Sequence, residues 1–381
     1  MLQRAASYWE TNRTLGHFDV LVVGGGMVGL WTAFHLKRQS PTLRLAIVEQ
    51  LPSGQAGAST RNAGFACFGS PTELLDDLRH ESPKDLLTRL TWRYEGLQAW
   101  RAQFNEADLG WQPGRGYEIF DTTQTQDWEA VLHNLERLNA LASEAGIPGT
   151  VYQEVAPPIT HLLGCISIEH EAGLHAGMAH QALKSAVTAL GVEFMHGVET
   201  PNQSEWRKEG PTWKLPSPQG SSIARHVVLA TNAWTGALLN RTDVLPGRGQ
   251  VLLTQPIANL PYRGTYHADE GYLYFRNFGD RLLLGGGRNA FRQEEETLLG
   301  ETTPQVQDYL EAYLRTVLLP GQAVEITDRW AGTMAFAPSG SKMPILESGE
   351  GTTIVARMGG MGVALSPEAG KKAAALVLGS L

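Results

Sequence analysis

A glycine-rich turn between two short apolar runs constrains the fold of this chain more than any other feature. Residues 18–23 (Phe-Asp-Val-Leu-Val-Val) are almost continuously apolar, as is typical of a strand buried on both faces of a parallel sheet. The turn 24–29 (Gly-Gly-Gly-Met-Val-Gly) follows, and apolar residues then recur at helical spacing over 30–36. A second apolar run, 43–48, ends at Glu49. The pattern predicts a strand–helix–strand unit at the start of the fold.

The three glycines of this turn have the spacing of a dinucleotide-binding motif. Gly24 permits a tight turn, Gly26 lets the backbone approach a pyrophosphate, and Gly29 lets the helix pack closely on the strand. The amide groups at the helix N-terminus favour the phosphate charge. Glu49 lies twenty residues beyond Gly29, where a carboxylate accepts hydrogen bonds from ribose hydroxyls. We therefore expect an adenine dinucleotide to bind here.

Composition excludes several other classes of protein. The net charge is −8 and no dense Lys/Arg stripe occurs, which argues against a nucleic-acid partner. The two cysteines, Cys67 and Cys165, form no CxxC pair, and we expect a reducing, cytoplasmic location with no signal peptide and no transmembrane segment. His170 and His175 are five residues apart and do not share a helical face, so no metal site is predicted.

Residues 57–65 (Gly-Ala-Ser-Thr-Arg-Asn-Ala-Gly-Phe) form a segment of small and polar residues after the second strand. NAD enzymes of this fold do not need such a segment at this position. A flavin ring needs backbone and hydroxyl donors close to it, and this segment offers them. At this point the chain resembles the FAD-dependent oxidoreductases of the D-amino-acid oxidase and glycine oxidase superfamily. The resemblance implies that the segment lines the pyrophosphate and the flavin ring.

Three later segments extend the resemblance over essentially the whole chain. They are 193–198, whose Val198 lies where the family uses a backbone contact to adenine, 227–235, which is similar to the family's strand beside the nucleotide, and 358–368, which is similar to its closing flavin loop. Together the motif and the resemblance imply FAD contacts from Gly24, Gly26, Met27, Val28, Gly29, Glu49, Gln50, Ala58, Ser59, Asn62, Ala63, Gly64, Val198, Ala230, Thr231, Gly359, Gly360, Met361, Gly362 and Val363.

The closing loop is followed by a helix that we expect to begin at Pro367, with Ser366 as its N-cap. Amide groups of the glycine loop and the positive end of the helix dipole would then point at the pyrimidine edge of the flavin. This arrangement raises the electron affinity of the flavin.

Within the superfamily, 272–287 and 330–334 are most similar to the γ-glutamylputrescine oxidase branch, which acts on amines. The short segment 7–9 (Ser-Tyr-Trp) is also similar to that branch.

The chain departs from the family at its substrate end. Amino-acid-oxidising relatives often place an arginine after the Trp-x-Gly turn to bind the substrate carboxylate, and Met334 stands there in this chain. Arg276 or Arg248 could replace it, and the alternative is a surface or structural role for each of them. Some relatives carry an oxygen-activating lysine on the strand 282–284 or a cysteine that links FAD near 333–334. Both are missing here, so we expect non-covalent FAD.

Hydride transfer from an amine carbon to the flavin requires positioning more than acid–base groups. Tyr272, Tyr274 and Arg276, on a strand expected to cover the flavin, are the candidate substrate residues, together with Met334. An alternative is that these side chains only pack the sheet.

The sequence predicts an α/β fold, in which a Rossmann-like FAD-binding domain of the GR2 type carries an inserted α+β substrate domain built on an antiparallel sheet. The expected FAD-binding segments are 1–80, 151–247 and 326–381, and the expected substrate segments are 81–150 and 248–325.

The expected reaction is oxidation of the C–N bond of a small amine or amino acid to an imine, with oxygen reoxidising the flavin to give hydrogen peroxide. The alternatives are a D-amino-acid or N-methyl-amino-acid dehydrogenase that passes electrons to a carrier, a catalytically weak FAD-binding protein, and an NAD-dependent dehydrogenase.

Overall fold

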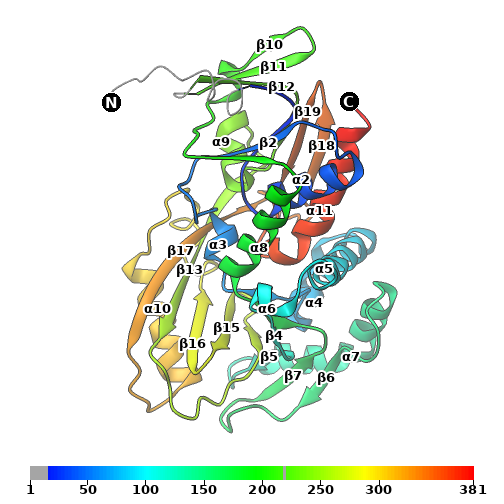
Figure 1. Ribbon diagram of the computed structural model, residues 1–381. Coiled ribbons are helices and arrows are strands. Elements are labelled where there is room, and N and C mark those ends of the chain that lie inside the picture. The colour runs from blue at the N-terminus through cyan, green and yellow to red at the C-terminus, as the bar shows by residue number, and fades with distance from the viewer. Residues whose placement is uncertain (1–15, 218–219) are drawn as a thin grey trace. The chain divides into compact units, whose positions relative to one another are not determined.

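The computed structural model describes residues 16–217 and 220–381, so the segment 7–9 lies outside the described residues (Figure 1). The chain divides into two compact units. Unit 1 contains the described residues of Met1–Thr60, Gly177–Pro246 and Met334–Leu381, and unit 2 contains Arg61–Ala176 and Gly247–Thr333. None of the helices in the described part of the chain is long and apolar enough to cross a bilayer.

Unit 1 is built on a largely parallel sheet. Strand β1 (His17–Val23) lies between β2 (Leu45–Glu49) and β12 (Gly220–Leu229) and runs parallel to both. Strand β2 also pairs with β9 (Glu193–His196), and β12 pairs with β19 (Thr352–Ala356), again in parallel. Antiparallel strands complete the sheet: β10 (Arg207–Glu209), β11 (Thr212–Ser217) and β18 (Ile345–Gly349).

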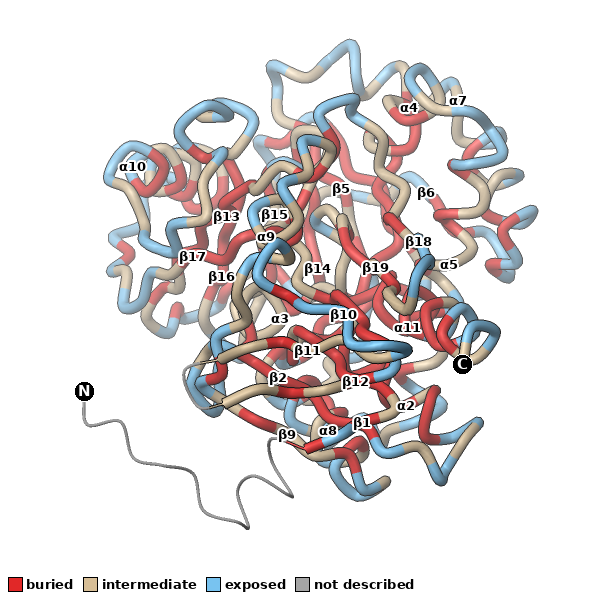
Figure 2. The backbone as a smooth tube through the Cα atoms, turned by 90° about the horizontal axis from the view of Figure 1, so that it is seen from above, coloured by how far each residue is buried: buried red, intermediate tan, exposed pale blue. Residues whose placement is uncertain are grey.

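Both faces of this sheet are covered, which explains the continuous apolar runs of its strands. On one face, Leu21 and Val23 join an apolar cluster with Trp206. On the other face, Val22 lies under helix α2 (Met27–Gln39), which packs against α11 (Gly362–Leu378). The two helices lie side by side in Figure 1, and β1 and β2 are mostly red in Figure 2 because their residues are buried. Two further helices belong to the unit, α8 (Ala176–Ala189) and α9 (Thr235–Leu239).

Unit 2 is built on a mainly antiparallel sheet with the strand order β17-β13-β16-β15-β14-β5-β7-β6. Its strands are β5 (Gly116–Phe120), β6 (Tyr152–Val155), β7 (Gly164–Ile168), β13 (Leu245–Thr254), β14 (Thr265–Ala268), β15 (Leu273–Phe278), β16 (Arg281–Gly286) and β17 (Ile326–Phe336). One face is apolar and includes Leu252, Phe275 and Leu284, and helix α10 (Pro304–Tyr313) packs on it through Val306 and Leu310.

The opposite face of the same sheet carries a smaller apolar cluster that includes Phe65, Tyr274 and Leu283. Phe65 belongs to a small sheet in which β8 (Ala172–Gly173) lies between β3 (Phe65–Ala66) and β4 (Gln112–Pro113). Further helices of unit 2 are α4 (Pro71–His80), α5 (Pro83–Gln103), α6 (Glu106–Leu109) and α7 (Thr125–Glu144), and the short α3 (Ala58–Arg61) lies at the boundary between the units.

The expected start of the last helix is wrong. Helix α11 begins at Gly362, so Ser366 is not an N-cap and Pro367 lies inside the helix. Pro367 has no N–H for the carbonyl oxygen of Val363, which an uninterrupted helix would pair with residue 367. The Ser366 hydroxyl donates to that carbonyl oxygen at 3.3 Å, and this bond explains how the helix tolerates the proline.

Other differences concern boundaries. The Trp-x-Gly segment is not a turn, because β17 continues through it from Ile326 to Phe336. Residues 61–80 and 151–176, which the sequence assigns to the FAD-binding domain, group with unit 2. For the later segment the cause is strand pairing, since β6 and β7 extend the sheet that contains β5. The assignment of the two units to FAD and substrate stays a prediction.

The contact between α2 and α11 depends on Gly370. A Cβ at this position would lie 2.6 Å from the Cβ of Trp31 and 2.8 Å from the backbone nitrogen of Thr32. We expect Gly370→Ala to lower the free energy of unfolding by up to about 2 kcal/mol, because a helix-propensity gain of about 1 kcal/mol offsets only part of an overpacking cost of roughly 1–3 kcal/mol. Urea denaturation measures the change.

Gly379 provides the control, because its φ is −72° and the nearest contact of an added Cβ would be 3.4 Å. Gly379→Ala should change stability by less than about 0.5 kcal/mol. Equal losses in both variants would contradict the close-approach argument.

Candidate cofactor and substrate site

The turn between β1 and α2 admits only glycine at two positions. Gly24 has a φ of +107°, and a Cβ there would lie 2.5 Å from the carbonyl oxygen of Ala230. A Cβ at Gly29 would lie 2.0 Å from the carbonyl oxygen of Gly24. The close approach therefore brings the end of β12, with Ala230 and Thr231, beside the turn.

The N-terminus of α2 faces a hydroxyl group. The backbone nitrogen of Met27 donates to Oγ of Ser59 at 2.9 Å, and a Cβ at Gly26 would lie 2.9 Å from the same Oγ. Val28 follows in the first turn of the helix. The absence of side chains on the turn, an amide at the helix start and a hydroxyl beside it form a cradle that fits a pyrophosphate.

Glu49 lies at the end of β2 and is held by backbone amides. Its Oε2 accepts from the backbone nitrogen of Gly25 at 2.8 Å, and its Oε1 accepts from that of Leu51 at 2.9 Å. The backbone nitrogen of Val198 donates to the carbonyl oxygen of Glu49 at 3.1 Å, while Gln50 is exposed. These bonds fix the carboxylate, and each oxygen keeps a second lone pair for a ribose hydroxyl.

The closing glycine loop lies beside the end of β17. The backbone nitrogen of Gly359 donates to the carbonyl oxygen of Ala335 at 3.1 Å, and a Cβ at Gly360 would lie 3.9 Å from Sδ of Met334. Helix α11 starts directly after Met361, with Gly362 and Val363 in its first turn. Met334 is therefore a neighbour of the loop that the sequence assigns to the flavin.

The polar segment after Ser59 is divided between the units. Ala58 and Ser59 belong to unit 1, whereas Asn62, Ala63 and Gly64 belong to unit 2. Oδ1 of Asn62 accepts from the backbone nitrogen of Gly64 at 2.9 Å, and a Cβ at Gly64 would lie 2.1 Å from the carbonyl oxygen of Leu174. Only glycine fits at position 64, because the backbone there lies so close to Leu174, the residue after β8.

The two candidate residues on β15 share one face of the unit 2 sheet. Tyr274 and Arg276 are two residues apart in the strand, so their side chains point the same way. Tyr274 pairs across the ladder with Gly285, where a Cβ would lie 2.5 Å from its ring. Tyr272 precedes the strand and is 36% exposed. The structure thus separates Tyr272 from the other two.

Arg276 is buried without a counter-ion. The side chain is only 2% exposed, and its Nε and Nη1 have no hydrogen-bond partner. No carboxylate among residues 16–217 and 220–381 forms an ion pair with it. Burial lowers the pKa of Arg276 to about 10, so the group stays protonated at neutral pH. A buried cation of this kind requires an anion or other acceptors to balance its desolvation.

A second buried polar atom lies in the same place. Thr265 of β14 pairs directly with Arg276, so their side chains share one face, and Oγ1 of Thr265 has no partner among the described residues. The sequence analysis missed Thr265, because no motif marks it. Only the pairing of β14 with β15 brings it beside the guanidinium.

Arg248, the other candidate for a carboxylate-binding residue, is already engaged. Its Nε and Nη2 donate to the two carboxylate oxygens of Glu295 at 2.9 and 2.6 Å. Arg248 is 4% and Glu295 is 1% exposed. The bidentate pair favours a structural role for Arg248, which the sequence leaves open beside a carboxylate-binding role.

Comparison with known proteins places the chain in a family. Residues 19–376 match the family model described as FAD dependent oxidoreductase, and the chain belongs to this family. A glycine oxidase of Bacillus licheniformis is 23% identical over 95% of this chain and 94% of its own length.

Solved structures agree in fold. Glycine oxidase from Geobacillus kaustophilus superposes with a TM-score of 0.74 at 22% identity, covering 95% of both chains. L-proline dehydrogenase from P. horikoshii has a TM-score of 0.73 at 16% identity, covering 96% of this chain and 94% of that one. The predicted α/β fold with its additional sheet is confirmed, and the protein is an FAD-dependent oxidoreductase.

The Arg248–Glu295 pair gives a stability prediction. Arg248→Met leaves a buried carboxylate without its cation and should cost about 3–5 kcal/mol of unfolding free energy. Arg248→Met with Glu295→Gln removes both charges, so the double variant should lose less than the sum of the single losses. Denaturant unfolding of the four proteins of this cycle measures the coupling. Additive losses would show that the pair contributes no interaction.

Proposed function

We propose that this flavoenzyme oxidises the C–N bond of a small amine that also carries a carboxylate, and that Arg276 binds this carboxylate. The observation that carries the proposal is the buried guanidinium, whose Nε and Nη1 have no partner in the described protein. An amino-acid carboxylate would supply two acceptor oxygens and the missing negative charge, and an arginine binds such a group in a bidentate manner. Thr265 Oγ1 would donate a further hydrogen bond to it.

The residues of unit 1 are proposed to hold the cofactor. The turn at Gly24, Gly26 and Gly29 would receive the pyrophosphate, with Met27, Val28 and Ser59 beside it. Glu49 would bind the ribose, with Gln50, Val198, Ala230 and Thr231 near the adenine end. Bound FAD supplies the acceptor for the hydride that leaves the amine-bearing carbon. The oxidised substrate is an imine, which water hydrolyses to a carbonyl compound and an amine.

The remaining site residues have positioning roles in this proposal. Asn62, Ala63 and Gly64, together with Gly359, Gly360, Met361, Gly362 and Val363, are proposed to surround the flavin. Tyr274 would form an apolar wall near the substrate, since burial raises the pKa of its hydroxyl to about 12 and keeps it neutral. Tyr272 and Met334 are weaker candidates, because Tyr272 precedes the strand and Met334 packs on the glycine loop.

The electron acceptor and the branch of the family belong to the proposal as well. Oxygen is the proposed electron acceptor for the reduced flavin. An electron carrier is the alternative, because one structural neighbour is named an oxidase and another a dehydrogenase. The similarity of 272–287 and 330–334 to γ-glutamylputrescine oxidases supports an amine with a distant carboxylate. An α-amino acid is the other substrate class that Arg276 fits.

Anaerobic mixing with amines tests the proposal. The flavin absorbance of the wild-type protein should bleach with at least one carboxylate-bearing amine from a panel that includes glycine, D- and L-alanine, sarcosine and γ-glutamylputrescine. The matching amines without the carboxylate should bleach it far more slowly. Admission of air should restore the colour and release peroxide. Bleaching that ignores the carboxylate would contradict the role of Arg276.

Arg276→Met should weaken binding of the carboxylate substrate by about 10- to 100-fold, because charged hydrogen bonds of roughly 1.5–3 kcal/mol are lost. The same variant should unfold at an equal or higher temperature than the wild type without substrate, since it removes an unpaired buried charge. Arg263→Met is the control, because the Arg263 side chain is 58% exposed. A structural role for Arg276 would instead lower stability and leave substrate affinity unchanged.

A further inference from the structure

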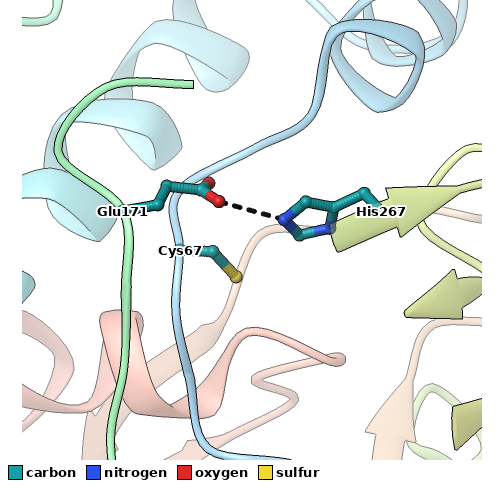
Figure 3. Close-up of side chains that lie close together, drawn as sticks. All are labelled: Cys67, Glu171 and His267. Carbon is teal, nitrogen blue, oxygen red and sulfur yellow. Dashed lines mark hydrogen bonds and ion pairs between the residues drawn. The ribbon is translucent and has the colours of Figure 1, made fainter. Parts of the chain in front are cut away.

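Three side chains from distant parts of the sequence meet inside unit 2. Cys67 follows β3, Glu171 precedes β8 and His267 lies on β14. Their donor atoms all lie within 4.8 Å of one another, and all three residues are buried (Figure 3). In Figure 3 the Cys67 side chain lies beside the Glu171–His267 contact. A thiol, an imidazole and a carboxylate therefore converge in one buried place.

The Glu171 carboxylate is oriented by a backbone amide and lies against a glycine. Oε1 of Glu171 accepts from the backbone nitrogen of Phe68 at 3.1 Å, while Oε2 lies 3.0 Å from Nε2 of His267. The carboxylate lies against Gly116, where a Cβ would be 2.1 Å from Oε2. In metal sites, groups outside the ligand shell commonly orient a ligating carboxylate by hydrogen bonds. The Phe68 amide would have this role here, and Gly116 leaves room for the carboxylate.

The donor set selects a class of metal. Zn²⁺ binds thiolate, imidazole and carboxylate, with bond lengths near 2.0–2.3 Å, and three such donors then lie about 3.5 Å from one another. The hard ions Mg²⁺ and Ca²⁺ prefer oxygen ligands and do not suit a thiolate. In the observed group the donor atoms lie within 4.8 Å of one another, so the wider separations must shorten to reach the zinc geometry.

We propose that Cys67, Glu171 and His267 form a zinc site, in which three protein ligands leave one position of the tetrahedral shell for a further ligand. The ion would join the segment after β3 to β8 and β14, next to the strand that carries Arg276. The site goes beyond the proposed oxidation and does not depend on it.

No motif announces such a site. Glu171 and His267 are separated by 96 residues, and Cys67 is one of two cysteines in the chain with no CxxC partner. Only the ladder of unit 2 brings the ligands together, which explains why the sequence analysis predicts no metal.

The test uses the full-length, FAD-loaded protein. After treatment with a chelator and gel filtration, the protein is titrated with Zn²⁺, and bound metal is counted by mass spectrometry of the digested sample. We expect one zinc per chain. Titration with Co²⁺ should give the near-ultraviolet charge-transfer absorption of a cobalt–thiolate bond, which reports Cys67 directly.

Cys67→Ala should remove this absorption and weaken Zn²⁺ binding by at least about 100-fold, since outer-group changes alone cost 10- to 100-fold. Cys165→Ala is the matched control, because Cys165 is equally buried but belongs to the apolar cluster on the opposite face of the sheet. His267→Gln provides a second ligand variant if Cys67→Ala fails to retain FAD. Absence of stoichiometric Zn²⁺ and of the cobalt–thiolate band in the wild type, or an unchanged band in Cys67→Ala, would overturn the proposal.

Discussion

The close approach of backbone segments at the first glycine turn is the constraint on which unit 1 depends. Gly29 brings α2 so near to β1 that a single methyl group would overlap the carbonyl oxygen of Gly24. Gly24 in turn lies against Ala230, so the ends of β1 and β12 and the start of α2 meet at one point. Side chains are excluded there, and the backbone amides can approach a phosphate directly. The proposed cofactor site thus follows from packing that the fold itself requires.

Unit 2 shows a different use of its sheet. One face is a continuous apolar core under α10, while the other carries Tyr274, Arg276 and Thr265. A buried guanidinium and a buried hydroxyl without partners reduce the stability of a free protein. Such groups are retained where a ligand completes them, which is the physical basis for assigning a carboxylate to this face.

Much of this architecture is predictable from the sequence, because the determining signals are local. The apolar run of β1, the glycine spacing and Glu49 lie within one short stretch and define the first strand–helix–strand unit. The alternating residues of β15 likewise show that Tyr274 and Arg276 share a face. The family resemblance, carried by segments from Gly24 to the closing loop, agrees with the match to the FAD dependent oxidoreductase model.

One signal fails for a local reason, and the others fail because they need long-range pairing. Pro367 suggests a helix start, yet α11 begins earlier, at Gly362. The Ser366 hydroxyl donates to the Val363 carbonyl oxygen, which Pro367 cannot pair with because it has no N–H. The sequence does not distinguish Arg248 from Arg276 as a carboxylate-binding candidate. Only the structure shows that Glu295 already pairs with the Arg248 guanidinium. Thr265 and the Cys67 group are invisible for the same reason, since strand register places them.

The most direct test is a crystal structure of the FAD-bound protein with a short, unreactive carboxylic acid. We expect FAD with its pyrophosphate at the turn before α2, and a carboxylate whose oxygens lie about 2.7–2.9 Å from nitrogens of Arg276. A carboxylate bound at another cation, with Arg276 still lacking an acceptor, would contradict this expectation.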